Sequence, residues 1–96
     1  MQTDLQKIID LRESTTHEVI DMLITALHLN IQHVDLDPDT PLFGSGLGLD
    51  SVDAVMIVVE IESRYNLSIS EEEGMHAVRT VNSIIDLVIR KKYNNA

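Results

Sequence analysis

The sequence predicts an all-α protein, a bundle of three main helices and one short helix with a long connection between the first two. Hydrophobic residues recur every three or four positions in three separate segments, which is the spacing of one face of an α-helix. No segment shows the sustained alternation of a half-buried strand. With 96 residues, 44% of them hydrophobic and few of them aromatic, the chain suits a single domain with an aliphatic core.

The first main helix is expected over residues 15–29. Thr15 and Glu18 have the spacing of a capping box, which marks a helix start. The apolar residues that follow at helical spacing are Val19, Ile20, Leu23, Ile24 and Leu27. Residues 1–14 form an N-terminal extension that also suits a helix, either continuous with the first one or separate from it. Its apolar residues are Leu5, Ile8 and Ile9.

Residues 30–49 form the long connection, which is rich in turn-forming residues such as Asp37-Pro38-Asp39 and three glycines. Connections of this length are uncommon in compact domains unless they serve a function. We expect its apolar residues to hold it against the core. These are Phe43, Leu47 and Leu49.

A second main helix is expected over residues 51–65, followed by a short helix and a last main helix. Ser70 and Glu73 have the spacing of another capping box, which opens the short helix that Gly74 weakens. Thr80 is the expected N-cap of the last helix. Its apolar residues are Val81, Ile84, Ile85 and Val88, and its last turn holds Arg90, Lys91 and Lys92, where cations suit the helix dipole. We assign the bundle to residues 15–92 and a C-terminal tail to residues 93–96.

The helix expected over residues 51–65 is apolar on two opposite faces, since successive residues are about 100° apart. The inner face holds Ala54, Ile57, Val58, Ile61 and Tyr65. The opposite face, here called the outer stripe, holds Val52, Val55, Met56 and Val59. A bundle of this size has too few helices to cover both faces, so we interpret the outer stripe as a docking surface with a charged rim. The alternatives are that residues 1–14 cover it or that the protein dimerises there.

Acidic residues are concentrated in one part of the chain. Residues 35–73 hold ten acids and one base, Arg64, so this segment carries the whole net charge of −9. Such a surface disfavours nucleic acid and attracts basic protein partners. Cysteine is absent, and we expect no membrane span, no signal peptide, a cytoplasmic location and a monomer.

No catalytic or metal-binding set is expected. Asp35, Asp37 and Asp39 have the alternate spacing that opens a calcium loop, but Thr40 stands where such a loop requires glycine. Ser51 has no nearby base and would be a poor nucleophile. It could serve as a helix cap, or as a hydroxyl that another enzyme modifies, because a helix N-terminus stabilises a phosphate.

The segment Gly48-Leu49-Asp50-Ser51-Val52-Asp53 resembles the phosphopantetheine attachment motif of acyl carrier proteins, G-x-D-S-[LIVM]-[DE]. The resemblance covers roughly residues 15–92. It implies a four-helix bundle of acyl-carrier type, with 4′-phosphopantetheine attached to Ser51 beside Asp50. The group would come from coenzyme A through a separate phosphopantetheinyl transferase. Acyl groups would then be held as thioesters on it, and the chain itself would catalyse nothing.

The resemblance also implies a pocket and a partner surface. The acyl-chain pocket would be lined by Ala54, Val58, Ile61 and Ile69. The surface that partner enzymes contact would comprise Asp50, Val52, Asp53, Val55, Met56, Val59 and Glu60. Those partners would be acyl-transferring, ketosynthase-type or acyl-activating enzymes with basic docking patches, in fatty-acid, polyketide or related biosynthesis.

Three departures from the family pattern favour a dedicated carrier over a housekeeping fatty-acid carrier. Met56 stands where the family often has glutamate and Val52 where leucine is commoner, and the N-terminal extension is unusual. One alternative is an aminoacyl or peptidyl carrier protein, although such carriers usually have a less acidic loop before the serine. The other is an unmodified helical module that binds a partner through the outer stripe.

Overall fold

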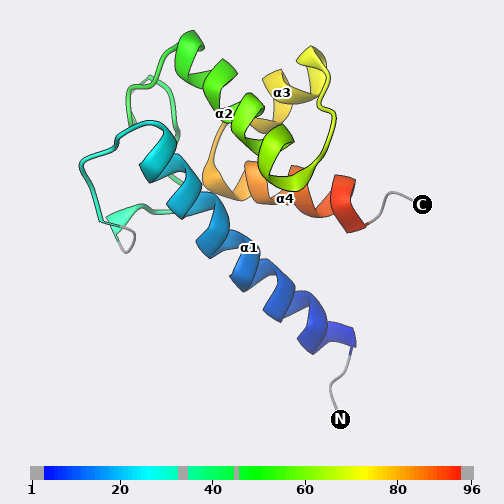
Figure 1. Cartoon of the computed structure of the whole chain (residues 1–96). Coiled ribbons are helices and arrows are strands. Elements are labelled where there is room, and N and C mark those ends of the chain that lie inside the picture. Colours follow the sequence, from blue (N-terminus) through cyan, green and yellow to red (C-terminus); the bar gives the residue numbers. More distant parts are fainter. Residues whose placement is uncertain (1–3, 33–34, 45, 94–96) are drawn as a thin grey trace.

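The computed structural model describes residues 4–32, 35–44 and 46–93. It contains four helices (Figure 1), which are α1 (Asp4–Ala26), α2 (Ser51–Tyr65), α3 (Glu71–Ala77) and α4 (Val81–Tyr93). The described residues form isolated bridges but no β-strand, so the predicted all-α class and the order of the helices are confirmed. Residues 1–3 of the extension and 94–96 of the tail lie outside the described residues.

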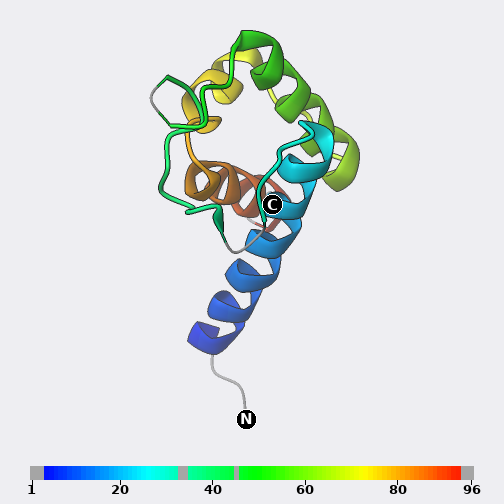
Figure 2. The same ribbon diagram turned by 90° about the vertical axis from the view of Figure 1, so that its left-hand side faces the viewer.

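α1 is a single continuous helix, which decides between the two alternatives for the N-terminal extension. Because α1 begins at Asp4, the predicted capping box at Thr15 and Glu18 is wrong, and both residues lie inside the helix. Thr15 is buried, and the Glu18 carboxylate accepts a hydrogen bond of 2.7 Å from the Tyr65 hydroxyl. The first turns of α1 extend beyond the other helices (Figures 1 and 2).

α1 also ends three residues earlier than predicted. His28 adopts a left-handed backbone conformation with φ of 53°. Its N–H donates to the carbonyl of Thr25 (3.4 Å), and the N–H of Leu29 donates to the carbonyl of Ile24 (3.0 Å). These two bonds form a Schellman motif, which satisfies the last carbonyls of a helix and turns the chain away. The apolar spacing therefore continues past the point where the helix stops.

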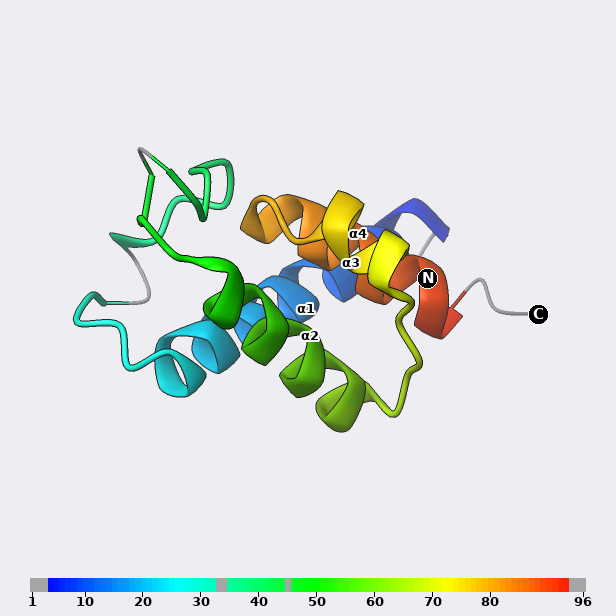
Figure 3. The ribbon, with the colours of Figure 1, turned by 90° about the horizontal axis from the view of Figure 1, so that it is seen from above.

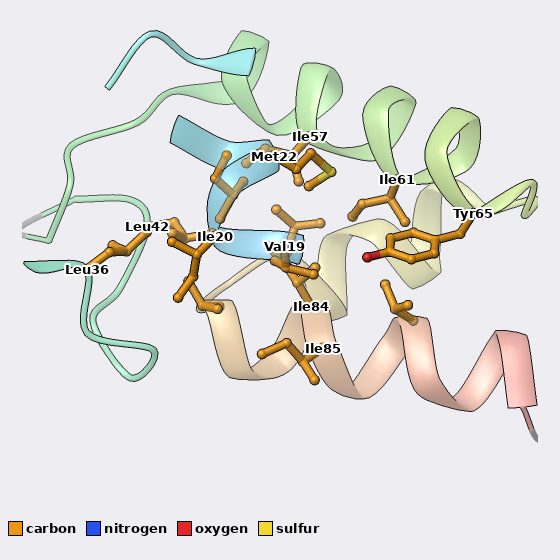
Figure 4. Packing of buried hydrophobic residues seen from close by; sticks show 14 residues of the cluster. Val19, Ile20, Met22, Leu36, Leu42, Ile57, Ile61, Tyr65, Ile84 and Ile85 are labelled. Carbon is orange, nitrogen blue, oxygen red and sulfur yellow. The ribbon is translucent and has the colours of Figure 1, made fainter. Parts of the chain in front are cut away.

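The core lies between α1, α2 and α4, and the connection closes one side of it (Figure 4). The residues labelled there are Val19, Ile20 and Met22 of α1, Ile57, Ile61 and Tyr65 of α2, Ile84 and Ile85 of α4, and Leu36 and Leu42 of the connection. Phe43, Leu47 and Leu49 pack against this cluster, as predicted. Leu36 and Leu42 are also buried, although the sequence pattern does not predict them as core residues.

The connection is held to the helices by hydrogen bonds. Asp37 forms the predicted turn, because its carboxylate accepts from the N–H of Asp39 (2.9 Å) and its carbonyl from that of Thr40 (3.0 Å). The N–H of Asn82 in α4 donates to the carbonyl of Pro38 (3.0 Å). Seen from above in Figure 3, the connection occupies the end of the molecule where α2 begins.

Both later caps are confirmed. Ser70 and Glu73 exchange hydrogen bonds between side chain and backbone, at 3.1 and 3.0 Å, and open α3. Thr80 and Ser83 do the same at 3.1 and 2.9 Å and open α4. These reciprocal bonds satisfy N–H groups that the first turn of a helix cannot pair internally. No helix in the described part of the chain combines the length and apolar character needed to cross a bilayer.

Candidate functional site

Ser51 is the first residue of α2, and the helix cap is the residue before it. The Asp50 carboxylate accepts from the N–H of Asp53 (3.0 Å), and the Asp53 carboxylate accepts from the N–H of Asp50 (3.0 Å). This capping box fixes where α2 begins. The capping role that the sequence left open for Ser51 therefore belongs to Asp50.

Two glycines shape the chain just before this cap. Gly48 has a positive φ of 72°, which side chains other than glycine rarely adopt. Gly46 lies so close to Pro41 that a Cβ on it would sit 1.7 Å from the Pro41 carbonyl oxygen. The next backbone bond, from Leu49 N–H to the Leu42 carbonyl (3.0 Å), ties the segment to the core side of the connection. Ser51 is thereby presented at a defined place on the surface.

The Ser51 side chain is exposed and uncommitted. Within the described residues its hydroxyl takes part in no hydrogen bond, and the two carboxylates beside it bond to backbone N–H groups. A serine without a base is a weak nucleophile by itself. Its hydroxyl is nevertheless open to an enzyme that brings its own base.

A cavity of about 530 Å³ lies between α2 and α3, and Ser51 is part of its lining. Three of the four residues predicted for an acyl pocket line it, namely Ala54, Val58 and Ile69. The fourth, Ile61, does not. It is fully buried in the core between the helices, because it faces α1 and α4 one turn further along α2.

Several other residues that line this cavity are not predicted from the sequence pattern. They are Phe43, Ser70, Glu71, Gly74, Met75, Val78 and Arg79. Gly74 is the one with a visible signal, since a glycine inside a helix often marks a close approach. A Cβ on Gly74 would lie 3.2 Å from a methyl carbon of Val58, so glycine lets α3 pack tightly over α2.

The outer stripe is exposed, as the pattern of α2 predicted. Its side chains retain 65% (Val52), 63% (Val55), 40% (Met56) and 54% (Val59) of their accessible surface. The extension does not cover it, because Leu5, Ile8 and Ile9 are exposed as well. Val55 and Val59 also contribute to the lining of the cavity, so the outer stripe continues into the cavity mouth.

Carboxylates surround the serine and the stripe. Asp50 and Glu60 are exposed and Asp53 is half-buried. The segment that contains them has a net charge of −9, so a basic surface would be attracted to it. A hydrogen-bonded cap keeps Asp50 and Asp53 in fixed positions at the start of this face.

A second cavity, of about 390 Å³, lies between α3 and α4 and is more polar. It is lined by Glu72, Glu73, His76, Ala77, Ser83, Asp86, Leu87 and Arg90. None of these residues belongs to α2. Among the residues that the structure describes, no three histidine, aspartate or glutamate side chains gather in the manner of metal ligands.

A family model described as "Phosphopantetheine attachment site" matches residues 17–88 of the chain. That range contains α2, α3, the whole lining of the cavity beside Ser51 and most of the core. It begins inside α1 and ends inside α4.

Curated acyl carrier proteins are similar to the chain over most of their length. The protein of Chlorobium phaeobacteroides is 27% identical over 74 residues, which cover 77% of this chain and 90% of the relative. The Porphyromonas gingivalis protein is 28% identical over 71 residues, covering 74% and 86% of the two chains. The Azobacteroides pseudotrichonymphae protein is 29% identical over 70 residues, covering 73% and 79%.

Proposed function

Because this chain belongs to the family of acyl carrier proteins with a phosphopantetheine attachment site, we propose that its Ser51 is the attachment point. The chain is thus a carrier and not an enzyme, and its cofactor is covalent 4′-phosphopantetheine from coenzyme A. The observation that carries the assignment is the free hydroxyl of Ser51, exposed beside the cavity while Asp50 does the capping.

The residues around Ser51 suit this role in separate ways. Asp50 and Asp53 hold the first turn of α2 in place without using the serine, so modification of its hydroxyl leaves the cap intact. The backbone N–H groups at the start of α2 favour a phosphate group there. When attached, the cofactor supplies a thiol on which acyl groups are held as thioesters, in a chain that has no cysteine.

The cavity between α2 and α3 is the proposed shelter for the acyl group. Ala54, Val58 and Ile69 present apolar surface to it, and burial of each methylene of an aliphatic group there would contribute about 0.8 kcal/mol. Ile61 is not among the residues proposed to contact the acyl group, because it is buried in the core. An acyl group with an apolar body fits this lining better than an aminoacyl group with a charged amine.

We propose that partner enzymes contact the outer stripe and its acidic rim. The apolar centre consists of Val52, Val55, Met56 and Val59, and the acidic rim of Asp50, Asp53 and Glu60. An apolar centre within a polar rim is the usual anatomy of a transient protein interface. The partners are a phosphopantetheinyl transferase and acyl-transferring, ketosynthase-type or acyl-activating enzymes with basic docking patches.

The pathway is proposed to be fatty-acid, polyketide or related specialised biosynthesis, served by a dedicated partner set in the cytoplasm. Met56 supports a dedicated set, because an apolar residue there shifts docking from charge pairing toward apolar contact. The domain division is also a proposal. Residues 15–92 would form the carrier domain and residues 1–14 an extension, and α1 runs from residue 4 of the extension into the domain without a break.

The modification can be tested by intact mass. The apo protein is incubated with coenzyme A, Mg²⁺ and a broad-specificity phosphopantetheinyl transferase, and we expect the mass to rise by one phosphopantetheinyl group. Ser51→Ala should stay unmodified and fold normally, because the capping box does not use Ser51.

Ser70→Ala is the matched control, since Ser70 also lines the cavity but caps α3. It should accept the group like the wild type. A wild type that stays unmodified with several such transferases would contradict the carrier assignment and favour an unmodified interaction module. Loading of the modified protein by an amino-acid-activating enzyme in preference to an acyl-transferring one would favour the aminoacyl carrier.

A further inference from the structure

Arg79 is the one basic residue among the described side chains that line the cavity beside Ser51. The other lining residues are apolar apart from Ser51, Ser70 and Glu71. A lone cation at the edge of an apolar cavity has no obvious structural purpose there. Arg79 lies in the turn between α3 and α4, outside the sequence motif around Ser51.

The backbone of Arg79 is firmly placed. Its N–H donates to the carbonyl of Ala77 (3.0 Å), and its carbonyl accepts from the N–H of Leu42 (2.9 Å). The carbonyl of Leu42 in turn accepts from the N–H of Leu49 (3.0 Å). Leu42 therefore links the backbones of Arg79 and Leu49 through two hydrogen bonds. Ser51 follows Leu49 by two residues.

The side chain of Arg79 is exposed and available. In the part of the chain that the structure describes, its guanidinium takes part in no ion pair or hydrogen bond. The acid-rich segment has one base of its own, Arg64, in the last turn of α2. Arg64 lies thirteen positions after Ser51 in the same helix, which corresponds to about 20 Å along the helix axis. Of these two arginines, Arg79 is the one that lines the cavity that Ser51 also lines.

We propose that Arg79 pairs with the phosphodiester that joins the arm to Ser51, and so directs the arm along the cavity between α2 and α3. A guanidinium matches two phosphate oxygens with a planar pair of N–H donors, which a lysine cannot do. Glu71 lines the same cavity and is a competing anion for the arginine, but no bond joins the two among the described residues. The inference rests on the proposed modification of Ser51 and adds a positioning residue to it.

The test uses the full chain, modified by the transferase and checked by intact mass before any other measurement. The ³¹P resonance of the phosphodiester is recorded in the wild type, Arg79→Gln, Arg79→Lys and the control Arg64→Gln. The same samples in urea give the reference position of an unpaired diester. The backbone bonds of Arg79 do not involve its side chain, so Arg79→Gln should keep the fold, which circular dichroism checks.

We expect the wild-type resonance to differ from its position in urea, and Arg79→Gln to lose most of that difference. Arg79→Lys should keep part of it, and Arg64→Gln should match the wild type. Raising the salt concentration should move the wild-type resonance toward that of Arg79→Gln, because an exposed ion pair is screened.

A folded Arg79→Gln with the wild-type resonance would overturn the inference. So would an Arg79→Gln that the transferase leaves unmodified, because the arginine would then contact the transferase and not the arm. If neither the wild type nor any variant gains the mass of a phosphopantetheinyl group, the proposed modification of Ser51 fails. Intact mass shows this before any spectrum is recorded.

Discussion

Asp50 and Ser51 are neighbours at the start of α2, and their side chains have different tasks. Asp50 bonds to the backbone of Asp53 and closes the first turn, while the hydroxyl of Ser51 stays exposed. Serine and aspartate are both good N-caps, so either could have taken the position. Because the aspartate takes it, the serine is free to be modified without loss of the helix start.

Glu73 shows how one carboxylate can join two helices. It accepts from the N–H of Ser70 (3.0 Å) and from the ammonium of Lys91 in α4 (2.9 Å). The backbone bond from Ser70, followed by the bond from Lys91, lowers the pKa of Glu73 from 4.5 to about 2. Its charged form is thus favoured in the folded state.

We predict that Glu73 makes the protein more sensitive to acid. Because its pKa is lower folded than unfolded, its contribution is fully present above about pH 4.5 and is lost as the pH falls toward 2. Urea unfolding between pH 7 and pH 3 measures this. Glu73→Gln should lose less stability over that range than the wild type.

Glu72→Gln is the control for this prediction, because it removes the same charge one residue away and leaves the bonds of Glu73 in place. Its acid sensitivity should match that of the wild type. If the free energy of unfolding depended on pH equally in Glu73→Gln and Glu72→Gln, the role assigned to Glu73 would be wrong.

Tyr65 links helices in a different way. Burial and the bond to Glu18 raise its pKa, so the phenol stays neutral and donates a hydrogen bond to the Glu18 carboxylate. The ammonium of Lys92 lies 5.2 Å from the centre of its ring. A single aromatic side chain therefore joins α1, α2 and α4.

At the scale of elements, α2 divides its apolar residues between two environments. Ile57, Ile61 and Tyr65 are buried, whereas the outer stripe is exposed. Helices α1 and α4 cover the buried face of α2. Helix α3 packs against α2 beside Val58, and against Ile69 in the segment that follows α2. The outer stripe is thus apolar surface of α2 that the other helices leave exposed.

We predict that Met56→Ala weakens binding to the transferase and leaves the fold unchanged. Met56 is 40% exposed, so its truncation should change the free energy of unfolding by about 0.5 kcal/mol or less. Loss of a central apolar contact typically costs more than about 1 kcal/mol in binding, which is a several-fold rise in KM for Ser51 modification.

Leu5→Ala is the control, because Leu5 is also an exposed apolar residue (66%) but lies at the far end of α1. It should change neither stability nor KM. Destabilisation of Met56→Ala by several kcal/mol would mean that the side chain is buried, and an unchanged KM would remove Met56 from the docking surface.

For the whole molecule, packing begins at Arg12 and Thr15. Residues 4–10 are exposed throughout, while Arg12 bonds to Asp86 (2.7 Å) and Asn82 (3.3 Å) in α4, and Thr15 is buried. The first turns of α1 are thus a helical projection from the bundle, as Figure 1 shows. They contribute little to the core.

We predict that deletion of residues 1–10 leaves a folded protein that the transferase still modifies. The free energy of unfolding should change by less than about 1 kcal/mol, since exposed terminal residues contribute little. Chemical denaturation and intact mass measure the two effects.

A longer deletion, of residues 1–18, provides the contrast. It removes the buried Thr15 and the bond between Glu18 and Tyr65, and should destabilise the protein strongly. If the shorter deletion alone unfolded the protein, the extension would be an integral part of the bundle.

Several features of the fold follow from local chemistry, which a sequence displays directly. The starts of α3 and α4 were predicted because their capping bonds join residues three apart, at Ser70 and Thr80. The start of α2 at residue 51 was also predicted. The same local pattern at Thr15 was misleading, because the helix continues through it and a capping pattern inside a helix has no free N–H groups to satisfy.

By itself, the sequence determined the all-α class, the order of the helices, the two apolar faces of α2 and the motif around Ser51, because these depend on neighbours within a few residues. Tertiary structure alone decided that Leu36 and Leu42 join the core, that Ile61 lies in the core outside the pocket and that Arg79 lines the pocket. Each of these depends on contacts between segments far apart in the chain. Such contacts form only when burial of the core brings the segments together, and no spacing along the chain encodes them.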